Sequence, residues 1–555
     1  MKQKFFCLLS AALFTVAMTA QNGPVRMWEG TIDLPTYRVN APEKAPLFER
    51  DFAYQRAKRS VYPYPMNDNP TDIKVDSTHK ALYLENDYLK VCVLPDIGGR
   101  LFYATDKTNG YEIFYRQSVI KPANVGMLGA WISGGVEWNV FHHHRATSQY
   151  PIDYKLVDNK DGSKTIWVGE VENRHRMSWA MGMTLHPDKS YIEVTGRFFN
   201  NAHDRNSMLH WNNVATHANE NYQIIFPECQ DFGTFHHKNS FLRWPVPDAP
   251  YCNNPAYEGV DISWWKNLPA LMGGSVFVYD LQDDFIGGYD YGYDAGTMLT
   301  GNHNINKGGK FWMWGSMNYG HEWDCVTLTD SDGPYVELMT AAYSDNQPDY
   351  CWINPYETKE FTAYWYGIRN LKAVNRGNEF ATVNMSIDPV GSVHVAANVT
   401  EIRRNAKVVV RHGDKVLYEK VSYMAPDKPF ADDFKVSAEE VAEPSEITMY
   451  LYSAEGEELI SYHPYKVDRN KPMPEPVVPL NMDPKSIDNQ EELYYLGMRN
   501  LQFHQAHVDP NIYFLEALRR DPGDVRCNTQ MGIFHRKNGE YEKAKKYLRT
   551  AIRRQ

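Results

Sequence analysis

The fold is decided by the stretch Gly333-Pro-Tyr-Val-Glu-Leu-Met-Thr-Ala-Ala-Tyr-Ser-Asp-Asn-Gln-Pro-Asp349 and by the segment that follows it, Asn354-Pro-Tyr-Glu-Thr-Lys-Glu-Phe-Thr-Ala-Tyr-Trp-Tyr366. Apolar and aromatic residues fill both segments and polar residues separate them, which predicts two β-strands with a polar connection. One carboxylate, Glu337, lies inside the apolar first strand. A buried carboxylate is costly unless it is paired or used in chemistry. We therefore predict that burial raises the pKa of Glu337 and that it acts as a general acid or base.

The same strand pattern extends over residues 21–375. Short alternating runs recur between Asp-Gly, Asn-Gly and Pro-Asp turns, for example Tyr88–Leu94, Lys164–Val168 and Tyr191–Phe199. No long helix interrupts them, so the pattern predicts a mainly β unit, a large sandwich of two stacked sheets.

A second, smaller β-rich module is predicted over residues 380–470. Val393–Val399, Lys407–Arg411 and Ile447–Tyr452 alternate cleanly, which is typical of an immunoglobulin-like sandwich. The proline-rich residues 471–488 then indicate a stiff linker.

Residues 489–555 change to a helical pattern with an internal repeat. Tyr513-Phe-Leu-Glu-Ala517 and Tyr547-Leu-Arg-Thr-Ala551 recur at a spacing of 34, and Leu496-Gly497 anticipates Met531-Gly532. This pattern resembles α-helical tetratricopeptide repeats, which implies a protein partner. Fewer than two full repeats are present and about three are needed for a continuous core, so we expect further repeats beyond residue 555.

The first twenty residues predict export. Lys2 and Lys4 precede a short apolar run that ends in small residues, as in a cleaved signal peptide. The run is too short to span a bilayer, and no later segment approaches the required length. We expect a periplasmic, cell-surface or secreted protein without a membrane span.

Charge and cysteine content narrow the function classes. The formal charge is −11 and becomes about −13 without Lys2 and Lys4 (−11 − 2), which disfavours nucleic acid as a partner. The cysteine spacing matches no metal motif, so we expect no metal and no cofactor. Cys229 and Cys252 are a candidate disulfide pair, because export permits disulfides.

The first candidate site segment is Ser133-Gly-Gly-Val-Glu-Trp-Asn-Val-Phe-His-His-His-Arg145. Strand alternation places Glu137 and Asn139 on one face, and His142 and His144 together if the strand persists. The histidines fit a polar loop, a metal site or, best, a sugar-hydroxyl site, because neutral imidazole both donates and accepts hydrogen bonds. Trp138 is a candidate sugar platform.

The second segment is Leu209-His-Trp-Asn-Asn-Val-Ala-Thr-His-Ala-Asn-Glu220. His210 and Asn213 supply neutral hydrogen-bonding groups, and Trp211 supplies a ring. A strand-end hydrogen-bond network explains these polar groups equally well.

The third segment is Trp314-Gly-Ser-Met-Asn-Tyr-Gly-His-Glu-Trp-Asp324. We predict a short loop that carries His321, Glu322 and Asp324 just before the strand of Glu337. Trp314 is a further candidate platform for a sugar.

These motifs resemble the galactose-mutarotase (aldose-1-epimerase) superfamily over about residues 80–370. The opening segment Leu84–Arg100 is similar to that family's first strands, and Glu337 matches the glutamate that takes a proton from the anomeric hydroxyl. Asn213 stands where the family's catalytic histidine is expected, which argues against simple mutarotation because asparagine cannot relay a proton. The order of segments resembles exported bacterial proteins of uncharacterised function that carry C-terminal tetratricopeptide repeats.

Three functions are consistent with these residues. The leading hypothesis is a glycoside hydrolase acting on an oligo- or polysaccharide, with Glu337 as one catalytic carboxylate and Glu137, or one of Glu322 and Asp324, as the other. The second is a sugar epimerase with Glu337 as base and His210 or His321 as acid. The third is a non-catalytic glycan-binding protein joined to a repeat scaffold.

Overall fold

The computed structural model describes residues 23–42, 62–125, 128–268, 273–477, 482–503 and 508–555. The predicted signal peptide over residues 1–20 lies outside these ranges. Within them, no helix is long and apolar enough to cross a membrane.

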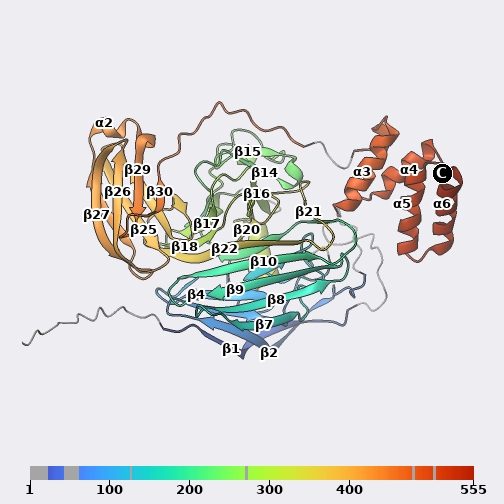
Figure 1. The fold of residues 1–555 in the computed structure, drawn as a ribbon, viewed down its shortest axis with the longest axis horizontal. Helices are drawn as coiled ribbons and strands as arrows, with labels where there is room; N and C mark the ends of the chain where they lie inside the picture. The colour runs from blue at the N-terminus through green and yellow to red at the C-terminus, as the bar shows by residue number, and fades with distance from the viewer. Residues whose placement is uncertain (1–22, 43–61, 126–127, 269–272, 478–481, 504–507) are drawn as a thin grey trace, which may run out of the picture.

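Two large sheets form the main unit (Figure 1). The first is a 12-stranded sheet in the spatial order β1 (Arg26–Val39), β2 (Pro70–Glu85), β3 (Leu89–Leu94), β4 (Arg100–Asp106), β6 (Val136–Asn139), β12 (Trp211–His217), β20 (Tyr335–Ala341), β19 (Gly308–Met313), β16 (Gly274–Val278), β14 (Phe232–Thr234) and β15 (Phe241–Arg243), with β5 (Tyr111–Glu112) beside β4. The second is an 8-stranded sheet in the order β13 (Tyr222–Ile225), β17 (Phe285–Asp290), β18 (Ala295–Thr300), β22 (Thr358–Arg369), β10 (Tyr191–Asn200), β9 (Met177–Leu185), β8 (Lys164–Glu172) and β7 (Asp153–Asp158). A two-stranded sheet pairs β11 (Asn206–Met208) with β21 (Cys351–Ile353).

The strand that carries Glu337 and the aromatic strand that ends near Tyr366 belong to different sheets. β20 lies in the 12-stranded sheet and β22 in the 8-stranded sheet, so the polar connection between them crosses from one layer to the other. The prediction of two strands with a polar connection is confirmed.

The core lies between the two sheets, and strand alternation decides which residues enter it. Trp138, Val214, Leu338 and Phe311 point from the 12-stranded sheet into one apolar cluster with residues of the 8-stranded sheet such as Trp365. Their neighbours in sequence therefore project from the opposite face of the 12-stranded sheet.

The second module has its own core and two four-stranded sheets. One sheet has the order β23 (Arg376–Gly377), β24 (Ala381–Ile387), β25 (Ser392–Val399), β28 (Phe430–Lys435), and the other β27 (Lys415–Met424), β26 (Arg403–His412), β29 (Ile447–Tyr452), β30 (Glu458–Tyr462); a short helix, α2 (Ala438–Val441), follows β28. All strands predicted for this module are present.

The described residues after the second module contain four α-helices: α3 (Gln490–Gln502), α4 (Asn511–Arg520), α5 (Val525–Lys537) and α6 (Tyr541–Arg554). A glycine lies at the contact within each of the two helix pairs α3–α4 and α5–α6. A Cβ on Gly497 would lie 2.5 Å from the Phe514 ring, and one on Gly532 would lie 2.6 Å from Leu548. The Leu496-Gly497 and Met531-Gly532 pairs thus mark equivalent close contacts between paired helices.

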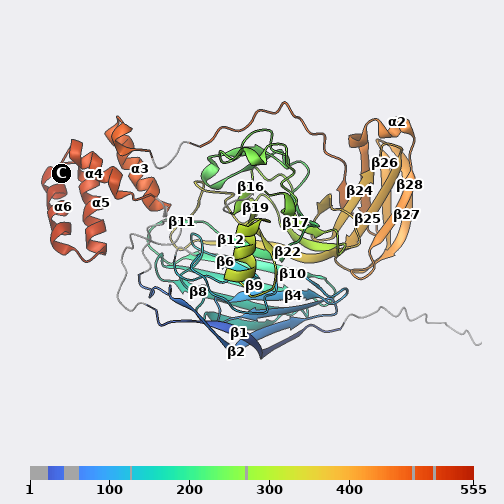
Figure 2. The same cartoon turned by 180° about the vertical axis from the view of Figure 1, so that it is seen from behind.

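The second module and the helices lie at opposite ends of the main sandwich (Figure 2). The helical end touches the sandwich through Phe503, the C-cap residue of α3, whose ring stacks on Tyr350 at 4.8 Å. At the other end, the Tyr462 hydroxyl donates to Glu228 at 2.7 Å.

The six cysteines in the described residues are all free thiols, including Cys229 and Cys252. The prediction of a disulfide between these two is wrong. Spacing alone could not place the two loops relative to one another.

Candidate active site

Four neighbouring strands, β6, β12, β20 and β19, bring the candidate groups to one face of the 12-stranded sheet. Asn213 on β12 pairs in register with Glu137 on β6 and with Met339 on β20. Lys310 on β19 pairs with Met339 as well. Glu337, two residues before Met339, projects from the same face. This face is the one opposite the sandwich core.

Glu137 is an ionised and fully paired carboxylate. It is 2% exposed, and its Oε2 accepts hydrogen bonds from Trp131 Nε1 at 2.8 Å and from His144 Nδ1 at 2.9 Å. Asn139, with its amide nitrogen turned toward Glu137, donates to Oε1 at 3.2 Å. Burial alone would raise the pKa of Glu137, but the charge and hydrogen bond of His144 and the charge of Arg100 outweigh it and lower the pKa to about 2.

His144 reaches Glu137 because the chain leaves the strand. β6 ends at Asn139, and His142 and His143 have φ angles of 89° and 69°. His144 is 24% exposed and also lies edge-on to Trp131, at 5.5 Å. Its burial opposes protonation, yet the Glu137 carboxylate raises the pKa of His144 above its ordinary value.

His142 lies in a different environment. It is fully buried, its Nε2 is 3.1 Å from Ser207 Oγ, and its ring lies 5.6 Å from Tyr350. His142 and His144 were expected together only if the strand persisted, and this condition is not met because β6 ends at Asn139.

Glu337 is buried, as predicted, and titrates near neutrality. It is 4% exposed, and the Tyr335 hydroxyl donates to its Oε1 at 3.2 Å. Trp314 Nε1 donates in turn to the Tyr335 hydroxyl at 3.0 Å. Burial raises the pKa of Glu337 to about 7; the charges of His144 and Lys310 oppose this shift, and that of Glu137 adds to it.

Asn213 lies between the two carboxylates in the sheet. It is 3% exposed, and its Oδ1 has no hydrogen-bonding partner among the described residues. An unpaired buried carbonyl is costly, and a ligand hydroxyl would satisfy it.

Lys310 is a site residue that the sequence patterns did not predict. It is 7% exposed, and its Nζ lies 4.5 Å from the Phe277 ring centroid and 5.9 Å from that of Trp211. Burial lowers the pKa of Lys310 to about 8, while the negative charge of Glu337 opposes the shift. The one signal in the sequence was its position in the apolar run Gly308–Met313, two residues before Trp312. Trp131 and Tyr335 were missed too, because hydrogen bonding to a carboxylate leaves no sequence pattern.

The segment before β20 is helical, so the prediction of a loop there is wrong. α1 (Asn318–Glu322) continues into a π-helical turn over Trp323–Thr327. The helix turns His321 and Glu322 to solvent and buries Asp324 completely. Burial, and then the charge of Glu337, raise the pKa of Asp324 to about 9. Asp324 therefore lies close enough to Glu337 for their charges to interact, whereas His321 and Glu322 are exposed.

Two predicted substrate-binding residues lie on the core side of the sheet. Trp138 is fully buried, donates to the Gly99 carbonyl at 2.8 Å and stacks on Trp365. His210 packs between Phe198 and Phe361, and burial lowers its pKa to about 3. The sequence showed that these residues alternate with site residues but not which set faces the core.

The predicted rings Trp211 and Trp314 lie on the site side but are almost enclosed, at 5% and 6% exposure. Trp211 contacts Lys310, and Trp314 stacks on Trp323 at 4.3 Å. Trp312 pairs in register with Glu337 and is half-buried, so it is the more accessible ring at this face.

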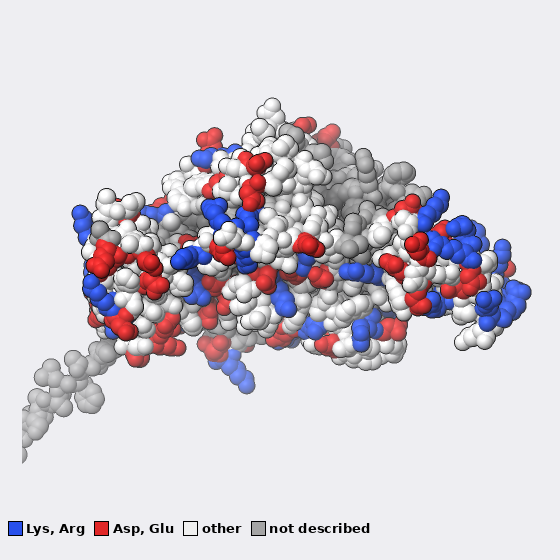
Figure 3. Space-filling view, turned by 90° about the horizontal axis from the view of Figure 1, so that it is seen from above, with Lys and Arg blue, Asp and Glu red and all other residues white. Residues whose placement is uncertain are grey.

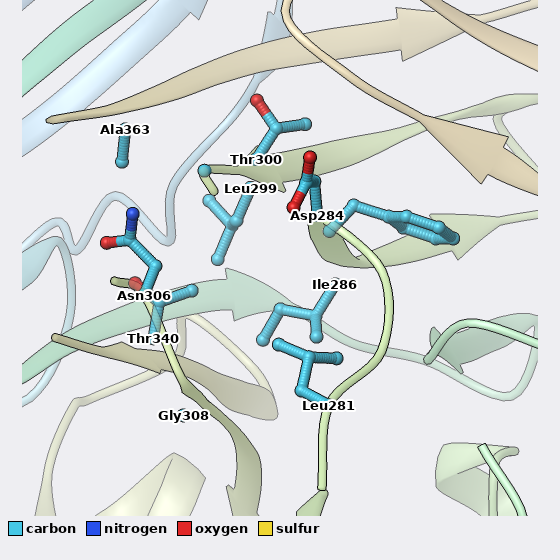
Figure 4. Close-up of a pocket in the computed structure, with 11 residues that line it drawn as sticks. Leu281, Asp284, Ile286, Leu299, Thr300, Asn306, Gly308, Thr340 and Ala363 are labelled. Atoms are coloured by element: carbon cyan, nitrogen blue, oxygen red, sulfur yellow. The ribbon is translucent and has the colours of Figure 1, made fainter. Parts of the chain in front are cut away.

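A separate hollow lies between the two sheets, and no predicted site residue lines it (Figure 4). Leu281, Ile286 and Leu299 are among its apolar lining residues, and Asp284 and Asn306 lie on either side of Leu299. We assign no catalytic role to this hollow.

The family model described as a domain of unknown function, DUF5107, matches residues 56–368, more than half of the chain. The chain belongs to this family. A second model, the second domain of YphG-like proteins, matches residues 377–462. The family match therefore covers all the strands that carry the candidate site.

Solved structures similar to this chain include a TPR-domain containing protein from Parabacteroides distasonis. It shares 16% identity and a TM-score of 0.55, with 96% of this chain and 80% of that chain covered, so the likeness concerns the fold. A galactose mutarotase-like protein from Clostridium acetobutylicum is 10% identical, with a TM-score of 0.35 over 53% of this chain and 96% of that one. A second galactose mutarotase-like protein, from Lactobacillus casei, covers 52% of this chain and all of its own at the same identity and score. TM-scores this low establish no shared activity.

Proposed function

We propose that this protein is a glycoside hydrolase with Glu337 as general acid and Glu137 as the charged catalytic carboxylate. The observation that carries the proposal is the opposite perturbation of two carboxyl groups on one sheet face. Burial raises the pKa of Glu337 to about 7, while paired hydrogen bonds and charges hold that of Glu137 near 2. Near neutral pH, one group can therefore donate a proton while the other stays anionic, which is the division of roles in a glycosidase.

The neighbouring residues support this chemistry. Tyr335 orients Glu337 through a hydrogen bond at 3.2 Å, and the unpaired Asn213 carbonyl would accept a sugar hydroxyl. Trp312, in register with Glu337, offers a half-buried ring on which a pyranose face can pack. Trp138 and His210 are not part of this proposal, since both lie in the sandwich core.

The separation of the strands favours inversion of the anomeric centre. Glu137 and Glu337 lie on strands two positions apart and are offset by two residues along the strands, so their backbones are separated by about 12 Å. Such spacing leaves room for a water between the carboxyl groups, as inverting enzymes require about 6.5–9.5 Å between them.

Incubation with a panel of plant and bacterial glycans tests the proposal, with wild type compared with Glu337→Gln and Glu137→Gln. We expect reducing-end release by the wild type and at least a thousandfold loss in either variant, because each removes one of the two required groups. Turnover by Glu337→Gln equal to that of the wild type would remove Glu337 from the mechanism.

A second candidate function is a sugar epimerase or mutarotase, favoured by the Glu137–His144 hydrogen bond at 2.9 Å. In that case Glu137 orients His144, the acid for the ring oxygen, and Glu337 is the base for the anomeric hydroxyl. Polarimetry on free aldoses distinguishes the two functions, since mutarotation changes optical rotation without releasing a product. A non-catalytic glycan-binding protein would show saturable binding that survives both glutamine substitutions.

We further propose that the C-terminal helices act as tetratricopeptide repeats that bind a protein partner, and that the chain is exported. The helical end is rich in basic side chains (Figure 3), including Lys543, Lys546 and Arg553 on α6. This charge fits a partner with an acidic surface. Cell fractionation tests export, and loss of partner capture on charge reversal of these three residues tests the docking face.

A further inference from the structure

Lys310 is a buried cation without an ion-paired carboxylate among the described residues. Its side chain points from β19 to the face that carries Glu137 and Glu337, and it is 7% exposed. Within the described part of the chain its Nζ forms no ion pair or hydrogen bond. The rings of Phe277 and Trp211 lie beside it, and the charge of Glu337 is close enough to act on it. A buried ammonium that has ring faces and no directly paired carboxylate is costly to maintain, so an anionic ligand at this face would stabilise it.

The other charges of the site compensate Lys310 only in part, through the charge of Glu337. Glu137 is already paired with His144, at 2.9 Å. Burial raises the pKa of both Asp324 and Glu337, which reduces the negative charge that these two carboxyl groups place near Lys310. The buried Arg100, which donates to the carbonyls of Gly134 and Ile132, adds a further positive charge next to Glu137.

The face therefore carries a net positive charge although the whole chain is acidic, at −11. An enclosed positive field of this kind attracts an anionic ligand and repels a cationic one. The positive potential is confined to this face, because Lys310 is buried and its charge is poorly screened only in its immediate surroundings.

Lys310 and Trp312 are two residues apart on β19, so their side chains project from the same face of the sheet. A pyranose ring that packs on Trp312 would place a substituent within reach of the Lys310 ammonium. A point charge on a flexible stem suits a carboxylate or sulfate whose orientation is set elsewhere, here by Asn213 and Trp312.

We propose that Lys310 binds the negatively charged substituent of an acidic sugar, so that the substrate is an anionic glycan, either a uronic-acid polymer or a sulfated one. This inference rests on the proposed function for the cleavage step, but the binding step stands on Lys310 alone. It makes Lys310 a specificity-determining residue.

The test is direct binding by isothermal titration calorimetry at pH 6 and low salt. The ligands are galacturonate and glucuronate, the 6-sulfates of galactose and N-acetylglucosamine, and the neutral parents galactose, glucose and N-acetylglucosamine. We expect at least one anionic sugar to bind ten times or more tightly than its neutral parent, with a preference that falls as NaCl is added. Preference for the uronates or for the sulfates identifies the anionic group.

The variants are Lys310→Met and, as a matched control, Lys266→Met, an exposed lysine whose Nζ lies 5.3 Å from the Trp264 ring. Lys310→Met should bind anionic and neutral sugars within twofold of one another, whereas Lys266→Met keeps the wild-type preference. Removing an unpaired buried charge should leave the variant at least as stable as the wild type, so thermal unfolding excludes misfolding as the cause. Equal binding of charged and neutral sugars by the wild type, or an unchanged preference in Lys310→Met, would overturn the inference.

Failure of this inference and failure of the proposed function are distinguishable. If wild type binds acidic sugars through Lys310 but cleaves no glycoside, the hydrolase proposal fails and the binding inference stands. If a neutral glycan is cleaved, with Glu337→Gln inactive and Lys310→Met fully active, the hydrolase stands and the anionic preference is wrong.

Discussion

Replacing Glu337 by glutamine should make the protein more stable at pH 8 while abolishing its activity. Glu337 is 4% exposed, and burial raises its pKa from the ordinary 4.5 to about 7. A carboxyl group whose pKa is higher in the folded than in the unfolded protein stabilises the fold fully below the unfolded pKa. That contribution is lost as the pH rises toward and through the folded pKa. Glutamine stays neutral and avoids the loss.

The magnitude follows from the two pKa values. The shift of 7 − 4.5 = 2.5 units corresponds to about 3 kcal/mol at pH 8, at about 1.4 kcal/mol per unit. At pH 5 the same calculation gives less than about 1 kcal/mol. Lys310 loses a neighbouring negative charge in the variant, which offsets part of the gain. We therefore expect Glu337→Gln to gain about 2 kcal/mol more at pH 8 than at pH 5.

Urea unfolding followed by tryptophan fluorescence at pH 5 and pH 8 measures this difference. Glu322→Gln is the matched control, because Glu322 is exposed on α1 and should change the free energy of unfolding by no more than about 0.5 kcal/mol at either pH. A Glu337→Gln variant that is destabilised equally at both pH values would show that Glu337 is ionised and well paired in the folded protein. In that case Glu337 could not be assigned as the general acid.

The remaining predictions concern the reaction, the helices and the thiols. The kcat/KM of the wild type should fall above about pH 7, as Glu337 loses its proton; a profile that stays flat to pH 9 would contradict its role as acid. Proton NMR of the first product should show the inverted anomer, and retention would contradict the inferred spacing of the carboxyl groups. Gly532→Val should destabilise the helical end by about 2 kcal/mol, because a Cβ there lies 2.6 Å from Leu548; an unchanged helical melting transition by circular dichroism would refute the close contact. Cys252 is exposed and should react with a thiol reagent in the native protein. The denatured protein should also migrate equally in electrophoresis with and without reductant. Alkylation of Cys252 only after reduction would instead indicate a disulfide with Cys229.

Local patterns in the sequence were sufficient for the strands and for the burial of Glu337. Alternation of apolar residues is a local property, and the run from Tyr335 to Ala341 forms β20 as expected. The same alternation correctly places Glu137 and Asn139 on one face of β6. The recurring Gly497 and Gly532, noted in the sequence as part of a repeat, both lie at close helix contacts in the structure.

The face of the sheet that each residue occupies could not be predicted, because it depends on contacts between distant segments. His210 and Trp138 were expected at the site, yet both enter the core with residues of the other sheet. A shift of one residue exchanges the two faces of a strand, and no local signal fixes that choice. Lys310 was overlooked for the same reason, since its importance comes from strands that are neighbours only in the folded protein.

Alternate residues of β20 face the core and the candidate site. A saturation mutagenesis scan from Tyr335 to Ala341 should therefore show two alternating patterns of sensitivity, one in protein yield and one in activity. Yield of soluble protein should dip at Val336 and Leu338, which fill the interior, and turnover should dip one position away, at Tyr335 and Glu337. Selection for expression and selection for activity would then act on different residues of the same strand. Substitutions under one selection could accumulate without affecting the property under the other.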